Sequence, residues 1–444
     1  EEGERARERN GEGEGEGGGE RDEDGQLRYL LDSVDILTSI VLVEKWRGKD
    51  SFFHPFLQSL PAVYTGLAYF SPSSLRRMGH PSSVKEASLK VEKVKRKYRR
   101  FQLAWANANE EGISEGDMRI VRQMQAISWT DYLWGYYSVM SRTCHIQGDH
   151  AGVMVPYGDL INHESPFYFQ RTRKEASVTQ MEKTHFRRGV DAHFWRPEGE
   201  EQDVRKVPLG EGSGCYRFFA HRDFEEGEEL FLSYGRHDNM TLLEVYGFSM
   251  PDNPFDTIQM DLPDLDRCSY TVVKGGVESG RDASSNRHKQ GGGGGKKKGE
   301  RGKKKERHSK RETGVVKSTL PRPDVLAAKE AALGRVMRGM LGVYYNEVSY
   351  NLLYGLRVCF MSDEAALDKA SHWALMDEHG DVDSMVDLFA YRYIRTKSQA
   401  FLAELSDGYP PPMCTEDSLA DVFRLSKQAI ADNMVLYTTQ FLES

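Results

Sequence analysis

The sequence predicts an α+β protein in which short β-sheets with a helical insertion are followed by an all-helical domain. Apolar residues recur at helical spacing before residue 147. Short β-branched or aromatic runs separated by Gly, Pro and charged residues then occupy 151–262, and helical patterns return after Pro321. A mixed domain followed by a helical one is the simplest architecture that accommodates this order.

The composition is that of a globular protein long enough for two or three domains. Hydrophobic residues make up 39% of the 444-residue chain, which contains 21 Tyr, 20 Phe and 6 Trp. The net charge of −8 is unevenly spread, because 1–25 is acidic and 296–311 is basic, so it says little about partners. No apolar run approaches the ~20 residues that a membrane-spanning helix needs.

The five cysteines show no C-x-x-C spacing, which argues against a zinc site and against a disulfide scaffold. No metal is therefore expected. A reduced intracellular compartment, cytoplasmic or nuclear, is the natural inference. Because the chain begins with Glu, a plastid location through a lost transit peptide stays open. The cysteines are Cys144, Cys215, Cys268, Cys359 and Cys414.

Composition also marks the domain boundaries. Residues 1–25 are acidic and Gly-rich and are predicted to be disordered, and 272–314 is predicted to be a basic, Gly-rich flexible linker. Between them, 26–265 forms the mixed domain, in which the polar stretch 167–213 is predicted to be mostly an insertion loop. The helical domain occupies 321–444.

Periodicity predicts the individual elements in this order. Helices are expected over 26–48, 84–112 and 239–248, with one or two over 115–144. Strands are expected at 151–156, 193–197, 215–224, 228–235 and 256–262. The chain after Pro321 is expected to be helical to its end, with helices over 322–357, 364–377, 383–406 and 416–442.

Two distant segments carry the strongest functional signal. In YGDLINHESP (157–166), Asn162 and His163 follow an apolar run and can present an amide and backbone groups to a ligand. Taken alone, an Asn-His pair more often caps the following turn. In the segment 225–248, Tyr234 ends a strand-like run, where its side chain can enter a pocket, although most such tyrosines simply pack.

Three further residues can complete the same pocket. Tyr246 and Phe248 lie in the helix-like segment beyond the strand that ends at Tyr234 and are placed to return to the same pocket. Arg142 ends an aromatic-rich helix, and from there its planar guanidinium group can form two parallel hydrogen bonds with a carboxylate. A helix-end arginine is otherwise usually a surface charge.

Four blocks of the chain, in order, resemble consecutive blocks of one subclass of SET-domain protein methyltransferases. This subclass includes the Rubisco large-subunit lysine methyltransferase and the actin-histidine methyltransferase. The resemblance implies a SET domain at 26–265 with a helical insertion at about 62–147, and a Rubisco-methyltransferase-like substrate-binding domain at 321–444. The blocks are VEKWRGKDSFFHPFLQSLP (43–61), YLWGYYSVMSRTC (132–144), VMVPYGDLINHESP (153–166) and FFAHRDFEEGEELFLSYGRHDNMTLLEVYGF (218–248).

The resemblance implies S-adenosylmethionine (SAM) as the cofactor. By position in the family pattern, Asn162 and His163 are expected to bind SAM, with Asp159 supporting their loop. Ser141 and Arg142 are expected to hold the amino-acid end of SAM.

The resemblance also assigns the substrate side. Tyr234 is expected to be the catalytic tyrosine beside the methyl group and the target nitrogen, and Tyr246 and Phe248 to line the adenine or lysine side. Lysine-directed members often have an aromatic residue two positions after the arginine, where this chain has Cys144. A wider substrate channel lined by Cys144 and Tyr234 is therefore expected.

Methyl transfer from SAM is an in-line displacement that needs a neutral amine held about 3 Å from the methyl group, away from water. Carbonyl oxygens and aromatic faces stabilise the sulfonium donor. A desolvating channel helps a lysine, with a reference pKa near 10.4, to lose its proton. An aromatic pocket with a hydroxyl at its mouth meets these needs.

The family pattern begins with a β-hairpin whose Gly-x-Gly turn cradles SAM, and nothing before Gln26 resembles it. GEGEGEGGG (11–19) contains Gly-x-Gly by composition alone, without flanking strand patterns. A truncated gene model is the preferred explanation, and a degenerate, inactive relative is the alternative.

The expected function is therefore SAM-dependent methylation of a lysine side chain in a protein substrate, which the helical domain docks. A histidine-directed methyltransferase and a non-catalytic SET scaffold that binds protein partners stay open. Nucleic-acid binding by the basic tract 296–311 is disfavoured, because the tract has no interleaved aromatics for base stacking. No membrane association is expected, and the chain is expected to be a monomer.

Overall fold

The computed structural model divides into two compact units. Unit 1 comprises the described residues of Glu1–Gln259, Gly342–Val348 and Tyr393–Ser444, and unit 2 those of Met260–Leu341 and Ser349–Arg392. The structure describes residues 20–21, 27–28, 31–108, 114–146, 149–164, 189–195, 215–220, 223–251, 253–265, 268, 270–273, 315–318, 322–334, 341–345, 347–367 and 384–443.

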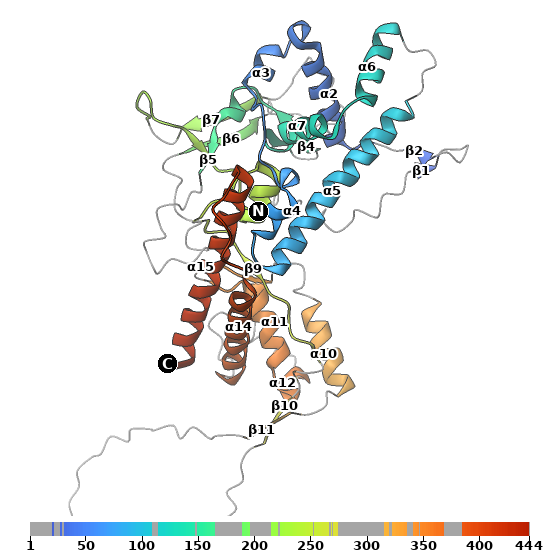
Figure 1. Cartoon of the computed structure of the whole chain (residues 1–444). Coiled ribbons are helices and arrows are strands. Elements are labelled where there is room, and N and C mark those ends of the chain that lie inside the picture. Colours follow the sequence, from blue (N-terminus) through green and yellow to red (C-terminus); the bar gives the residue numbers. More distant parts are fainter. Residues whose placement is uncertain are drawn as a thin grey trace, which may run out of the picture. The chain divides into compact units, whose positions relative to one another are not determined.

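Helix α2 (Ser33–Arg47) confirms the helix predicted over 26–48 but begins later (Figure 1). Asp32 caps it, because its Oδ1 accepts a hydrogen bond from the backbone N–H of Asp35 at 2.9 Å. Gly48, with φ of 59°, ends the helix.

Further helices follow in the stretch where the helical insertion is expected. Helix α5 begins at Pro81, where the ring nitrogen Nδ1 of His80 accepts from the N–H of Ser82 at 3.2 Å. The predicted helical segment 115–144 forms two helices separated at Ser128, whose hydroxyl caps the second. The described helices here are α3 (His54–Ser59), α4 (Pro72–Arg76), α5 (Pro81–Ala106), α6 (Glu115–Gln125) and α7 (Trp129–Met140).

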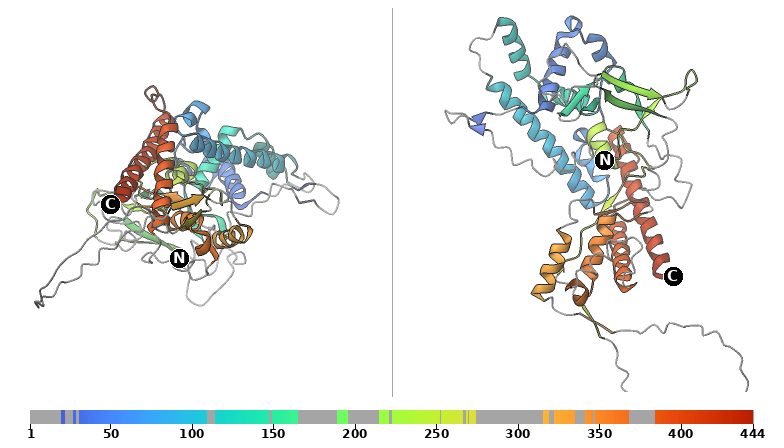
Figure 2. Two further views of the ribbon diagram at one scale, coloured as in Figure 1. Left: turned by 90° about the horizontal axis from the view of Figure 1, so that it is seen from below. Right: turned by 180° about the vertical axis from the view of Figure 1, so that it is seen from behind.

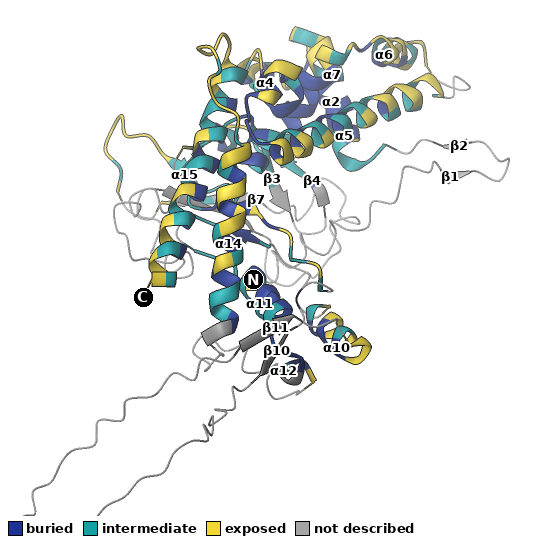
Figure 3. Cartoon of the chain, turned by 60° about the horizontal axis from the view of Figure 1, so that its bottom comes forward, coloured by how far each residue is buried: buried dark blue, intermediate teal, exposed yellow. Residues whose placement is uncertain are grey.

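Helices α2, α5 and α7 share an aromatic-rich core, visible as dark blue segments in Figure 3. Tyr132 and Phe101 are completely buried, with ring centroids 5.1 Å apart. The carboxylate of Asp35 is also buried, and it accepts from Arg100 Nη2 at 2.5 Å and from the hydroxyl of Tyr132 at 3.2 Å. This packing makes α7 a fixed support for the residues at its C-terminal end.

Strands follow α7 in unit 1. Strand β3 (Thr143–Ile146) pairs antiparallel with β4 (Asp149–Met154). A four-stranded sheet then has the order β5-β8-β6-β7, and Figure 2 shows β6 and β7 side by side. Its strands are β5 (Asn162–His163), β6 (Gly189–Trp195), β7 (Cys215–Ala220) and β8 (Phe231–Leu232).

The pairing of β5 with β8 is parallel, with Asn162 opposite Phe231 and His163 opposite Leu232. The Asn-His dipeptide is therefore part of a sheet, whereas the sequence predicted it only as part of a loop. Two strands of two residues each are too short to show a strand pattern. The pairing brings the two predicted functional segments together.

Unit 1 also contains the last helix of the chain. After α9 (Asn239–Thr241), a π-helical turn (Leu242–Tyr246) leads to β9 (Ile258–Gln259). Helix α15 (Thr415–Glu443) packs against α4, and Arg77 pairs with Asp421 of α15. Helix α14 (Ser384–Glu404) precedes α15.

The prediction of one helix over 322–357 is wrong. This stretch contains α10 (Pro323–Leu333), β12 (Gly342–Val343) and α11 (Tyr350–Phe360). Strand β12 pairs antiparallel with β9, and this long-range pairing overrides the local helical pattern. The chain after Pro321 is therefore not entirely helical. Ser349 caps α11, because its hydroxyl accepts from the N–H of Leu352 at 3.3 Å.

In unit 2, β10 (Tyr270–Val273) pairs antiparallel with β11 (Val315–Ser318), so strand residues flank the predicted linker. The basic tract 296–311 lies outside the described residues. Helix α12 (Asp363–Leu367) is the described part of the helix predicted over 364–377.

Other predictions fall mostly outside the described residues. Within the predicted disordered segment, β1 (Glu20–Arg21) pairs with β2 (Leu27–Arg28), and the rest of 1–25 is not described. Strand β6 lies inside the predicted insertion loop 167–213, whose remainder is not described.

The described residues contain neither a membrane-spanning helix nor a cluster of metal ligands. None of their helices combines the length and the hydropathy needed to cross a bilayer. No group of three or more His, Cys, Asp or Glu side chains among them is arranged to hold a metal ion.

Candidate functional site

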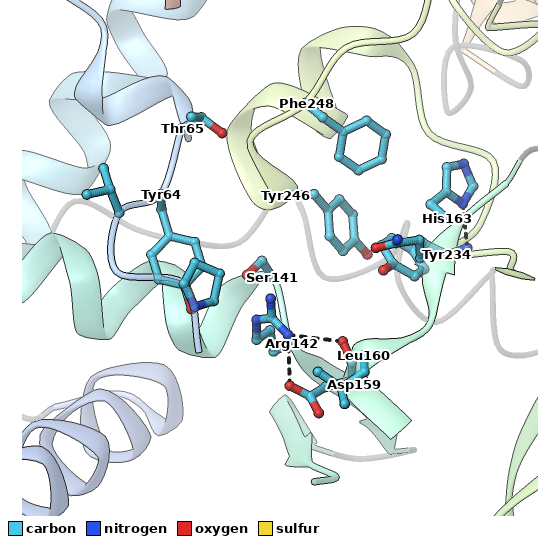
Figure 4. A pocket seen from close by; sticks show the side chains of 13 residues that line it. Tyr64, Thr65, Ser141, Arg142, Asp159, Leu160, His163, Tyr234, Tyr246 and Phe248 are labelled. Carbon is cyan, nitrogen blue, oxygen red and sulfur yellow. Dashed lines mark hydrogen bonds and ion pairs between the residues drawn. The ribbon is translucent and has the colours of Figure 1, made fainter. Parts of the chain in front are cut away.

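Four stretches of the chain, 61–65, 141–142, 159–163 and 234–248, line a cavity of about 450 Å³ in unit 1 (Figure 4). Eight of the nine residues singled out from the sequence line it, and Cys144 is the exception. The lining residues are Pro61, Val63, Tyr64, Thr65, Ser141, Arg142, Asp159, Leu160, Asn162, His163, Tyr234, Tyr246 and Phe248.

The pairing of β5 with β8 fixes Tyr234 at the cavity. Two residues beyond β8, the N–H of Tyr234 donates to Nδ1 of His163 at 3.0 Å. The hydroxyl of Tyr234 donates to the backbone carbonyl of Ile161 at 2.8 Å. Backbone and side chain of Tyr234 are thus both tied to the strand that carries Asn162.

Four rings form an aromatic wall on one side of the cavity, as Figure 4 shows. The ring centroids of Tyr234 and Tyr246 are 4.8 Å apart, and those of His163 and Phe248 are 5.8 Å apart. Aromatic faces of this kind attract cations and pack against planar or apolar groups.

The position of Tyr246 and Phe248 depends on a close approach of two chain segments. Gly247 has φ of +79°, and its N–H donates to the carbonyl of Leu242 at 2.9 Å, closing the π-helical turn. The hydroxyl of Thr65 donates to the carbonyl of Gly247 at 2.6 Å. A Cβ on Gly247 would lie 2.9 Å from the backbone nitrogen of Gly66, so glycine permits this contact.

A buried polar network closes the loop that carries Tyr246 and Phe248. The Asn239 side chain donates to the carbonyl of Met250 at 2.8 Å and accepts from the N–H of Met250 at 3.0 Å. The carboxylate of Asp256 accepts from the N–H of Asn239 at 3.1 Å. Two residues of α15 also donate to the carboxylate of Asp256: Lys427 Nζ at 2.8 Å and the hydroxyl of Ser426 at 2.7 Å.

Arg142 and Asp159 form an ion pair at the opposite side of the cavity. Arg142 Nη1 donates to Asp159 Oδ2 at 3.0 Å and to the backbone carbonyl of Asp159 at 3.1 Å. The Asp159 side chain is 0% exposed and that of Arg142 is 18% exposed. Nη1 of Arg142 is therefore hydrogen-bonded within the protein. Only part of the guanidinium is left to bind the carboxylate of a ligand, whereas the sequence predicted that two of its donors would be free.

Two buried polar atoms of this ion pair, Nε of Arg142 and Oδ1 of Asp159, have no hydrogen-bond partner among the described residues. The hydroxyl of Tyr64 lies beside them. Burial raises the pKa of this hydroxyl, and its interactions with Ser138 and Arg142 oppose that effect. Unpaired buried polar atoms are costly, which favours a ligand that pairs with them.

Burial sets the charge of two wall residues. It lowers the pKa of His163 to about 4, so the imidazole is neutral at neutral pH. Because the N–H of Tyr234 donates to Nδ1, the ring proton of His163 is on Nε2. Burial raises the pKa of Tyr234 to about 12, with the nearby Tyr246 adding to the effect, so its hydroxyl keeps its proton.

The remaining predicted residues are placed as follows. Asn162 is exposed, and its Nδ2 donates to Glu229 Oε1 at 2.8 Å. The hydroxyl of Ser141 donates to the carbonyl of Tyr137 at 2.6 Å, at the end of α7. Cys144 does not line the cavity; it lies on β3, where burial raises the pKa of its thiol.

Sequence analysis missed the lining residues that come from the loop 61–65 and from position 160. The loop 61–65 begins at the proline of a Leu-Pro dipeptide and ends before Gly66, so the loop itself was predictable. No periodic pattern distinguishes Tyr64 from a packing tyrosine. Leu160 stands beside Asp159 and was passed over as an apolar residue.

Comparisons with known proteins show similarity to SET-domain proteins. No family model matches the chain. It is 29% identical over 239 residues to Protein SET DOMAIN GROUP 40 of Arabidopsis thaliana, covering 52% of this chain and 43% of that protein. It is 24% identical over 253 residues to SET domain-containing protein 4 of Artemia parthenogenetica, covering 54% and 50%.

A more distant similarity reaches an enzyme named for its substrate. The chain is 20% identical over 220 residues to the actin-histidine N-methyltransferase of Canis lupus familiaris, covering 48% of this chain and 29% of that protein. The matches thus span half or less of the length of these curated relatives.

Solved structures extend the comparison to most of the chain. Rubisco LSMT bound to AdoMet matches with a TM-score of 0.52 at 13% identity, covering 93% of this chain and 76% of that one. The SET domain of LSMT bound to lysine and AdoHcy matches with a TM-score of 0.50 at 12% identity, covering 90% and 74%. The chain has the α+β SET fold, and its predicted resemblance to SET-domain methyltransferases is confirmed.

Proposed function

We propose that this protein is a SAM-dependent methyltransferase that transfers a methyl group to a lysine side chain of a protein substrate. The observation that carries the proposal is the shared cavity of the Asn-His strand and the Tyr234 segment. The similarity to SET-domain proteins supports the same reaction class.

The cavity contains groups that fit SAM. The unpaired Nε of Arg142 is a donor suited to a carboxylate, and the unpaired Oδ1 of Asp159 is an acceptor suited to an ammonium. The aromatic wall suits a sulfonium and an adenine ring. We assign Asn162, His163 and Ser141 to the same cofactor, as the family pattern implies.

SAM supplies an electrophilic methyl group on a positively charged sulfur. Tyr234 stays protonated and directs its proton to Ile161, which leaves the oxygen lone pairs free to accept from the N–H of a target amine. Tyr246 and Phe248 exclude water from the amine, and desolvation lowers the pKa of a lysine. Tyr234 therefore positions the amine instead of removing its proton.

The helical segments after 321 are the proposed docking region for the protein substrate, and an intracellular monomer that needs no metal is the proposed form. A histidine-directed reaction is the alternative, favoured by the similarity to actin-histidine N-methyltransferases. A non-catalytic scaffold is the remaining alternative.

The test is methyl transfer from deuterated SAM to peptide libraries that contain either lysine or histidine acceptors, read by mass spectrometry. Tyr69 packs with its ring centroid 5.5 Å from that of Tyr137 and does not line the cavity, so Tyr69→Phe is a matched control. Deuterated methyl groups on lysine are expected, and their loss in Tyr234→Phe but not in Tyr69→Phe would support the role of Tyr234. Transfer to histidine alone would establish the alternative target. A chain that does not bind SAM would overturn the proposal.

A further inference from the structure

His237 contacts the backbone of Tyr234, although it does not line the cavity itself. Nε2 of His237 lies 3.0 Å from the carbonyl oxygen of Tyr234. A carbonyl oxygen can only accept a hydrogen bond, so Nε2 carries a proton and donates it. The imidazole therefore reaches back across the turn to the residue three positions before it.

The turn between these residues is shaped for this contact. Gly235 has φ of +122°, and a Cβ there would lie 2.9 Å from Nε2 of His237, so glycine lets the ring approach. Nδ2 of the buried Asn253 donates to the backbone carbonyl of His237 at 2.8 Å. The same Nδ2 lies 3.3 Å from Oδ1 of Asn239, so His237 is anchored to the buried network around Asp256.

With this contact, all three polar groups of Tyr234 are held by hydrogen bonds. Its N–H donates to His163, its carbonyl accepts from His237, and its hydroxyl donates to Ile161. The two backbone bonds fix the peptide planes on either side of the Cα, and the third fixes the ring. The ring of His237 also packs with its centroid 5.8 Å from that of Tyr246.

We propose that His237 is a positioning residue that holds the hydroxyl of Tyr234 where it can accept a hydrogen bond from the target amine. This inference rests on the proposed function and adds a residue to it. His237 acts through Tyr234 and does not contact the methyl donor. Because a small displacement of a group at the reacting centre lowers the rate, loss of the contact should lower kcat without weakening SAM binding.

The test compares substitutions that keep or remove the donor. His237→Gln can place an amide N–H near the position of Nε2, whereas the shorter amide of His237→Asn cannot reach the carbonyl of Tyr234. His237→Phe keeps a ring beside Tyr246 but has no donor. His54, a half-buried residue of α3 that does not line the cavity, gives the matched control His54→Phe.

The expected result is a split between turnover and cofactor binding. The kcat for methyl transfer from SAM to a lysine peptide of the acceptor library should fall about tenfold in His237→Asn and His237→Phe. His237→Gln should keep most of the activity. Calorimetry should show unchanged affinity for S-adenosylhomocysteine in all three variants.

The outcomes separate the two proposals. A purely structural histidine would lower the melting temperature in His237→Phe without changing kcat, and that result would overturn the positioning role. Equal loss of kcat in His237→Gln and His237→Phe would overturn it as well. If the unaltered protein does not bind S-adenosylhomocysteine, the proposed function fails instead. Nitrogen-15 NMR of the imidazole then still tests the contact: a proton on Nε2 of His237 is expected, and a proton on Nδ1 alone would contradict it.

Discussion

The hydroxyl of Tyr234 donates to the backbone carbonyl of Ile161 at 2.8 Å, although 73 positions separate the two residues. This hydrogen bond ties the end of the β8 segment to the residue before the Asn-His strand. It also directs the phenol proton away from the cavity. The tyrosine therefore has both a structural and a proposed positioning role.

Replacing Tyr234 by Phe removes this hydrogen bond but keeps the ring. The free energy of unfolding is expected to fall by about 1 kcal/mol. Methyl transfer is expected to fall strongly while SAM binding is kept, because the proposed role of the hydroxyl is to contact the amine and not the cofactor. Chemical denaturation, calorimetry and a transfer assay on one preparation would separate these effects. Unchanged turnover would contradict the positioning role.

Replacing Gly247 by Ala tests how the aromatic wall is placed. The left-handed φ and the contact of a Cβ with Gly66 are expected to destabilise the protein by at least about 2 kcal/mol. Gly227→Ala is a matched control, because Gly227 has φ of +88° but open space around its Cβ, so about 1 kcal/mol is expected. Equal losses in thermal unfolding would show that the close contact is unimportant.

Lys427 links α15 to the loop that carries Tyr246. Lys427→Met leaves the buried carboxylate of Asp256 without its cation, which is expected to cost about 3–5 kcal/mol in unfolding free energy. Lys85 on α5 is exposed, so Lys85→Met is the matched control. It is expected to change the free energy of unfolding by less than about 0.5 kcal/mol. If Lys427→Met changes the free energy of unfolding as little as the control does, the ion pair with Asp256 is not needed to stabilise the loop.

Stability is expected to fall in acid through His163. Its pKa in the folded protein is lowered to about 4 by burial, below the ordinary value of 6.5. As the pH falls from 6.5 toward 4, the unfolded chain binds a proton that the folded protein excludes, so roughly 2–3 kcal/mol of stability is lost. The free energy of unfolding, measured by chemical denaturation at several pH values in this range, should depend less on pH in His163→Phe than in the unaltered protein. An identical pH dependence in the two proteins would contradict the lowered pKa of His163.

The helices of unit 1 and the convergence of the site segments could be predicted from sequence. Helix α7 has the aromatic periodicity of a core helix, and the order of the SET-like blocks placed Asn162 and Tyr234 at one site. The β5–β8 pairing itself was not predictable, because each strand is only two residues long. The resemblance to SET-domain proteins predicted that the two segments meet, whereas the local sequence pattern did not.

Other features depend on contacts that no local pattern reports. The residues of β12 follow a helical pattern, yet they pair with β9. Lys427 looks like an exposed charge on an amphipathic helix, but it is buried against Asp256. Tyr64 has the sequence context of any loop tyrosine. Each of these was decided by partners distant in the sequence.

The most direct test of the shared cavity is photo-crosslinking of radiolabelled SAM, followed by mapping of the labelled peptides. The predicted result is label on the peptides that contain Asn162 and His163 or Tyr234 to Phe248, with excess S-adenosylhomocysteine removing it. Label confined to other peptides, or label that S-adenosylhomocysteine does not displace, would contradict the account.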